Sequence, residues 1–308
     1  MNTQSSNMPG SFEAQTVGPA ALSATRPLYW SVRRELWENR SIYIAPLAAA
    51  AVFLVGFLIS MIHLPQRMRA LSTLDPAHQR QAIAMPYDMA AALLMLTAMI
   101  VGAFYCLGAL HGERRDRSIL FWKSLPVSDL TTVLSKAIIP IVLLQLLSFA
   151  ITVALQFIML LLSTAVLSAS GGNVATLWTQ LSFFHMSLGL LYHLVTVHAL
   201  WYAPFYGWML LVSAWARRAA FLWAALPLLA IGAFEKIVFN TQHFVALLEN
   251  RLNGGAEAMT MPGTFPMDPM THLTPGNYLI SPGLWLGLAF TALCLAAAIR
   301  LRRYRGAI

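Results

Sequence analysis

The sequence predicts an all-α integral membrane protein, and three observations support this fold class. The chain of 308 residues is 58% hydrophobic and only 10% charged, whereas soluble domains carry about 25% charged residues. Several apolar runs reach the roughly 20 residues that a helix needs to cross a bilayer. The positive charges gather between these runs and are divided unequally between alternate connections.

Six runs are long enough to be transmembrane helices. In chain order they are Ile42–Leu64, Met89–Leu110, Ala137–Leu167, Met186–Ala216, Ala219–Phe239 and Pro282–Ile299. The third and fourth exceed the length of a straight crossing, so we expect them to tilt or bend. Pro140 and Pro204 are the expected bend positions.

The distribution of Lys and Arg predicts the orientation. If both termini are cytoplasmic, fifteen of the twenty Lys and Arg residues lie inside and five lie outside. Cytoplasmic loops of membrane proteins carry such an excess of positive charge. We therefore expect a multi-pass protein of a bacterial inner (cell) membrane with both termini in the cytoplasm.

The sequence divides into a polar tail and a membrane domain. Residues 1–24 are polar and lack the apolar core of a signal peptide, which predicts a disordered cytoplasmic tail. Residues 25–308 form the six-span domain. Just before the first span, Trp30, Arg33 and Trp37 recur at helical spacing, which predicts a helix lying along the inner leaflet. An ordinary aromatic approach to the span is the alternative.

Several classes of function are disfavoured. The net charge of +8 comes from basic residues scattered between apolar runs, which indicates a membrane lipid surface rather than nucleic acid. The three lysines, Lys123, Lys136 and Lys236, follow Trp, Ser and Glu, so none completes a Walker-type phosphate loop. No HExxH motif is present. We therefore expect no catalytic residues and no cofactor in this chain.

The third span carries its polar residues on one stripe. Gln145, Ser148, Thr152, Gln156 and Ser163 project within about 80° of one another at 100° per residue. Lipid would penalise such a face, so it turns toward protein or water. Two interpretations stay open: the lining of a translocation path, and polar contacts between helices.

The segment between the fifth and sixth spans, which the predicted orientation places outside, carries a possible metal-binding pattern. Thioether sulfurs suit Cu(I), and four methionines lie close together on this segment: Met259, Met261, Met267 and Met270. Copper handling by this loop is therefore an alternative function.

A dense polar block, Gly112–Lys136, separates the second and third spans. A charged run at Glu113–Arg117, predicted to be solvated, leads into the apolar and aromatic Ile119–Leu125. Pro126 disfavours a helical Leu125, and Ser128 is placed to cap a new helix. The pattern predicts a short helix, a break and a helix start, forming a partly apolar knob that could dock on another protein. A structured turn between two spans is the alternative.

The block, written R117SILFWKSLPVSDLTTVLSK136 and preceded by an acidic residue at 113, resembles the membrane subunits of type-2 ABC exporters. Six spans, a surface helix before the first and a long outer segment before the sixth extend the likeness over roughly residues 26–305. The resemblance implies that the short helix is a cytoplasmic coupling helix that contacts a separate ATPase subunit. It assigns this contact to Glu113, Arg117, Phe121, Trp122, Leu125, Pro126, Val127 and Ser128.

The same resemblance implies an assembly. Two copies of the chain, or this chain and a related one, would pair with two ATPases that bind ATP and Mg. Small side chains at Ala98, Gly102 and Cys106 could support helix contacts. The expected function is thus that of an exporter permease that breaks no covalent bond itself. An ATP-independent membrane sensor or scaffold is the second alternative, beside copper handling.

Overall fold

The computed structural model describes residues 25–71, 73, 75–124, 127–252 and 279–304. The predicted tail, residues 1–24, lies outside these ranges. Within them the chain is helical and contains no strand, and six helical segments are long and apolar enough to cross a membrane. The predicted all-α membrane fold is therefore confirmed.

The described helices are numbered in chain order, with π- and 3-10 segments labelled η. They are α1 (Thr25–Glu38), α2 (Ser41–Ser60), η1 (Met61–His63), α3 (Leu64–Leu71), α4 (Pro76–Arg115), α5 (Ser118–Ser124), α6 (Asp129–Ile138), η2 (Ile139–Leu143), α7 (Leu144–Ala169), α8 (Val174–Gln180), α9 (Phe183–His193), η3 (Leu194–Trp201), α10 (Ala203–Trp215), α11 (Ala220–Phe239), α12 (His243–Leu252) and α14 (Pro282–Tyr304).

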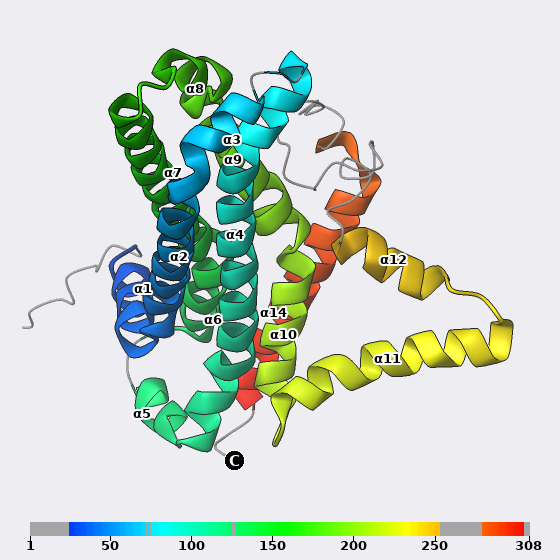
Figure 1. Ribbon diagram of the computed structural model, residues 1–308. Coiled ribbons are helices and arrows are strands. Elements are labelled where there is room, and N and C mark those ends of the chain that lie inside the picture. The colour runs from blue at the N-terminus through cyan, green and yellow to red at the C-terminus, as the bar shows by residue number, and fades with distance from the viewer. Residues whose placement is uncertain (1–24, 72, 74, 125–126, 253–278, 305–308) are drawn as a thin grey trace, which may run out of the picture.

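The long helices form a bundle whose two ends carry different elements. Figure 1 shows α4 running the length of the bundle, with α5 at one end and α8 at the other. We call these the α5 end and the α8 end. Helix α1 and the last turns of α14 both lie toward the α5 end. The bundle therefore brings the start of the described chain, the loop between the second and third spans and the end of α14 to the same side.

The third and fourth spans each contain a π-helical segment at the position where a bend was expected. Segment η2 contains Pro140, and η3 ends at Trp201, three residues before Pro204. Proline removes a backbone hydrogen-bond donor and crowds the preceding turn. Prolines and π-helical segments are both common causes of bends in long helices. The regular α-helix is thus interrupted at Pro140 and just before Pro204.

Small side chains allow close helix packing in the bundle core. Ala98 and Cys106 on α4 are fully buried, and a Cβ added to Gly102 between them would lie 3.2 Å from Tyr206 of α10. On α10, a Cβ at Gly207 would lie 3.1 Å from Thr291 Cγ2 of α14. The small face predicted on the second span therefore contacts other helices of this same chain.

Helix α11 departs from the bundle. It starts at the α5 end and runs outward at a steep angle to α4, and α12 folds back toward the bundle (Figure 1). Its start is held by Ala220 and Ala224, which pack with Val212, while most of its large apolar side chains are exposed. Lipid tails are as apolar as these side chains, so such a helix needs no protein cover in a membrane.

Helix α12 is anchored at both ends. Glu235 of α11 accepts hydrogen bonds from the backbone N–H groups of His243 and Phe244, at 2.7 and 2.8 Å, and from Thr241. At the other end, the Arg251 guanidinium lies 4.1 Å from the Trp201 ring centroid and donates to the Gly283 carbonyl. These contacts return the chain to the bundle before α14.

Candidate coupling site at the α5 end of the bundle

Helix α5 is set apart from α4 by a sharp reversal. Helix α4 ends at Arg115, and Arg117 takes a left-handed backbone conformation with φ 57°. Non-glycine residues seldom adopt this region, which is used mainly at turns. The Ser118 hydroxyl donates to the Glu113 carbonyl at 3.4 Å, and Ile119 is fully buried. The short helix is thus attached to the bundle on one side.

The other side of α5 is apolar and exposed. Leu120 and Phe121 have 60% and 59% of their surfaces exposed, and Lys123 donates to the backbone carbonyl of Arg303 at the end of α14. Helix α5 lies at the tip of the bundle (Figure 1), and Leu120 and Phe121 are exposed there. This combination of one anchored and one exposed apolar face suits contact with another protein.

Some predicted contact residues cannot be placed. Leu125 and Pro126, and the side chain of Trp122, lie outside the described part of the structure. Beyond them, Val127 is half-buried and Ser128 is exposed. The Ser128 hydroxyl accepts a hydrogen bond from the Thr131 N–H at 3.1 Å, with extended backbone angles. The N-cap predicted for the start of the third span is therefore confirmed.

A buried network of ion pairs lies directly behind α5. Lys136 of α6 is 2% exposed, and its Nζ lies 2.7 Å from Glu35 Oε1 and 3.1 Å from Glu113 Oε1. Glu35 belongs to α1 and Glu113 to the last turn of α4. A single ammonium group therefore joins three helices that are far apart in the sequence.

Further charges extend the network to the end of the sixth span. Arg302 of α14 pairs with Glu113 and, at 3.1 Å, with Asp129 in the first turn of α6. Arg34 pairs with Glu35 and Glu113 at 2.9 and 3.2 Å. The Tyr105 hydroxyl donates to Glu35 Oε2 at 2.9 Å. The four most buried members, Glu35, Glu113, Lys136 and Arg302, are thus two carboxylates and two cations, and buried ions require such pairing.

The network corrects one prediction. The run from Glu113 to Arg117 was expected to be solvated, and its second half is exposed, but Glu113 and Arg114 are only 8% and 6% exposed. Arg114 donates to the carbonyls of Ala214 and Ala216 at 2.7 and 3.3 Å. These two side chains point into the bundle because partners from other helices meet them there. Glu113 therefore lies behind α5, and Arg117 lies exposed at the turn.

The sequence contained one weak signal for this network. Glu35 falls on the same face of α1 as Val32 and Leu36, and both of these pack against the core. An acid on the apolar face of a helix requires a partner.

The exposed face of α1 carries Trp30 and Trp37, with Arg33 lying 5.2 and 4.9 Å from their ring centroids.

The polar stripe of the third span faces the interior of this chain. Its five members are at most 3% exposed: Gln145, Ser148, Thr152, Gln156 and Ser163. Gln156 Nε2 donates to the Tyr87 carbonyl at 3.1 Å, and Ser163 lies 3.4 Å from the Tyr87 hydroxyl. The contacts made by Gln156 and Ser163 favour the second of the two interpretations, polar contacts between helices.

Within the described residues, no group of three or more His, Cys, Asp and Glu side chains is placed to hold a metal ion. The methionines of the copper hypothesis, Met259, Met261, Met267 and Met270, lie outside the described ranges. Cys106 and Cys294 are buried, and neither forms a disulfide. Their positions within apolar runs of the sequence indicate that they pack as small hydrophobic residues.

Comparisons with known proteins add no relative: the chain matches no protein family, no curated protein and no solved structure.

Proposed function

We propose that this chain is the permease subunit of an ATP-binding-cassette exporter and that α5 is its contact with a separate ATPase subunit. The observation that carries the proposal is the position of α5. It is a seven-residue helix at the tip of the bundle with Leu120 and Phe121 exposed. The chain itself has no phosphate-binding loop, so energy from ATP would have to come from a partner.

The buried network behind α5 supports the same proposal. A force applied to α5 reaches the bundle through Ile119 and through the turn that carries Glu113. Glu113 pairs with Lys136 and Arg302, so a displacement of α5 would move α6 and α14 together. Packed elements joined by buried contacts move as units between discrete arrangements. Alternating access requires that the helices switch between two such arrangements.

The proposal places α5 in the cytoplasm of a bacterial inner membrane, on the side that receives most of the positive charge. A second copy or a related chain would complete the translocation path. ATP and Mg would bind in the ATPase partner. Sensor or scaffold function predicts no such partner, and the experiment below separates the two.

The test first asks whether a neighbouring reading frame encodes an ATPase of the ATP-binding-cassette type, and then co-expresses that ATPase with the chain. Phe121→Asp places a charge on the exposed face of α5 and should weaken co-purification of the ATPase at least about tenfold, as loss of an aromatic anchor does at other interfaces. Phe184→Asp is the matched control. Phe184 is 74% exposed in the first turn of α9, where an acidic residue is favourable.

Transport of the cargo into inverted vesicles, measured with ATP hydrolysis, gives the second readout. We expect Phe121→Asp to lose ATP-driven transport while keeping the thermal stability of the unmodified chain. Full co-purification and transport by this variant would refute contact through α5. Absence of any ATPase that binds the unmodified chain would favour the scaffold alternative.

A further inference from the structure

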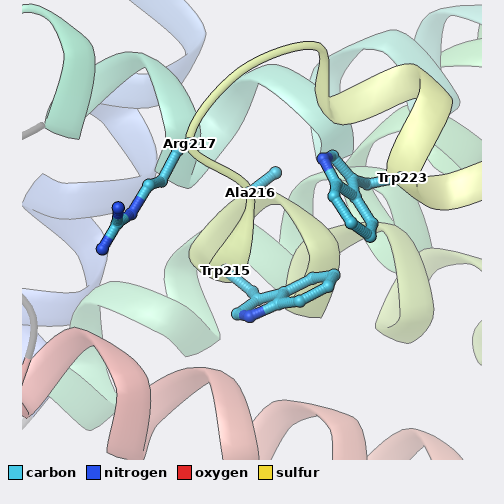
Figure 2. Close-up of a pocket in the computed structure, with 4 residues that line it drawn as sticks. All are labelled: Trp215, Ala216, Arg217 and Trp223. Carbon is cyan, nitrogen blue, oxygen red and sulfur yellow. The ribbon is translucent and has the colours of Figure 1, made fainter.

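A cavity of about 310 Å³ lies where α10 turns into α11, and Trp215, Ala216, Arg217 and Trp223 line it. This volume is at the lower end of the range of small-ligand sites. Figure 2 shows the two indole rings on one side of the loop, while the Arg217 side chain extends to the other. The indole rings give the cavity an apolar, aromatic side, and Arg217 is the cationic residue among the four that line it.

The walls of the cavity are fixed by contacts to α4 and α10. The Ala216 carbonyl accepts a hydrogen bond from Arg114 at 3.3 Å and lies 3.2 Å from His111 Nδ1. The Trp208 indole donates to the Ala224 carbonyl at 3.0 Å and so holds the first turns of α11. The ring centroids of Trp215 and Trp223 are 4.7 Å apart in an edge-to-face arrangement. These contacts hold the two rings and the loop between them in place.

The charge of the cavity selects an anion. Arg217 and its neighbour Arg218 are both exposed. Among the described residues neither of them pairs with a carboxylate, and no acidic side chain lines the cavity. Guanidinium groups bind phosphate oxygens through paired donors. A phosphate-containing headgroup with a net negative charge would therefore be favoured near Arg217 over a zwitterionic headgroup of zero net charge.

The surroundings select a lipid rather than a free anion. From the cavity, the exposed apolar surface continues along α11 through Phe221, Leu222 and Leu226. Tryptophan prefers the level of the lipid headgroups, where one part of its ring system is apolar and the N–H is wet. Acyl chains lying on this surface would place the headgroup of the same molecule beside Arg217.

We propose that the Trp215–Trp223 cavity binds an anionic phospholipid, with its phosphate on Arg217 and its chains against Trp223 and the adjoining face of α11. This site is separate from α5 and does not depend on the proposed function. It requires only that the chain lies in a membrane. The bound lipid would fill the angle between α10 and α11 and so set the direction in which α11 leaves the bundle.

Native mass spectrometry of the full chain in detergent tests the proposal. The probes are dioleoyl phosphatidylglycerol and dioleoyl phosphatidylcholine, added separately, with glycerol 1-phosphate as a soluble competitor. We expect phosphatidylglycerol to bind more tightly than phosphatidylcholine. Arg217→Gln should reduce that preference about fivefold, the effect of one basic residue at an anionic lipid surface. Glycerol 1-phosphate should not displace the lipid.

Three further variants keep the test decisive. Arg115→Gln removes a charge at the same end but outside the cavity, where Arg115 pairs with Asp116, and should keep the preference. Trp223→Ala should weaken binding of both lipids, whereas Trp223→Phe should retain it. Equal binding of the two lipids, an equal loss in Arg115→Gln, or displacement by glycerol 1-phosphate would overturn the proposal.

Discussion

The ammonium nitrogen of Lys136 lies 2.7 Å from the Oε1 atom of Glu35, and each side chain is 2% exposed. The two residues are 101 positions apart, so the pair joins α1 to α6. Buried charges are costly unless they are paired and hydrogen-bonded. In this chain each of the two has additional partners, Glu113 for Lys136 and Tyr105 for Glu35.

Removing the ammonium group should destabilise the bundle strongly. Lys136→Met keeps most of the side-chain volume but removes the fully buried ammonium group, and leaves the more exposed Arg34 as the cation that pairs with both Glu35 and Glu113. Loss of one partner from a buried ion pair typically costs about 3–5 kcal/mol. We expect a loss of this order in the free energy of unfolding, measured by denaturant titration in detergent micelles.

Arg115→Met is the matched control for this prediction. Arg115 also forms an ion pair, with Asp116 at 3.0 Å, but both side chains are more than 60% exposed. Exposed pairs contribute about 0–1 kcal/mol, so this variant should unfold nearly as the unmodified chain does. Similar stabilities for the Lys136 and Arg115 variants would contradict the burial of the network.

Glu35 and Lys136 should also be energetically coupled. Glu35→Gln and Lys136→Met each leave a charged group with a partner missing, whereas the double variant removes both charges of the pair. Residues in one ion-pair network show interaction energies of about 0.5–3 kcal/mol. We therefore expect the double variant to be more stable than the sum of the single losses predicts, in the same unfolding assay. Strict additivity would show that Glu35 and Lys136 do not interact.

Much of the fold follows from local sequence patterns. Apolar runs predict the six spans because the length of a crossing is set by the bilayer. Pro140 and Pro204 predict bends and Ser128 predicts a cap because each acts within one turn of helix. The structure confirms the cap at Ser128 and shows π-helical segments at Pro140 and just before Pro204. The direction of α11 was not predictable in this way, since a helix that is apolar all round has no face that specifies a neighbour.

The candidate site was predictable only in part. Exposed Leu120 and Phe121 belong to one short segment, and the sequence alone pointed to that segment as a docking surface. The network behind it combines residues of α1, α4, α6 and α14. Whether Glu113 faces water or Lys136 depends on how α1, α4, α6 and α14 pack against one another, and local sequence patterns do not determine that packing. The fold class and the exposed segment were therefore predictable, but the burial of Glu113 was not.

Two glycines of similar helical setting should respond oppositely to alanine. A Cβ at Gly207 would lie 3.1 Å from Thr291 Cγ2 and 3.3 Å from Thr291 Cα, whereas a Cβ at Gly108 meets nothing within 4 Å. Gly207→Ala should separate α10 from α14 and lower stability by about 1–3 kcal/mol, as overpacking does. Gly108→Ala should be neutral or raise stability by up to about 1 kcal/mol. Melting temperatures of the two purified variants distinguish these outcomes.

Glu235 should control whether α12 stays folded against α11. Its carboxylate accepts hydrogen bonds from the N–H groups of His243 and Phe244, which begin α12 and have no partner within that helix. Glu235→Ala removes both acceptors, so the first-turn amides of α12 should exchange with deuterium several-fold faster in the purified chain. Glu249→Ala removes the same charge from an exposed position on α12 and should leave these amides unchanged. Equal exchange in the two variants would mean that α12 is held by its Arg251 end alone, through Trp201 and Gly283.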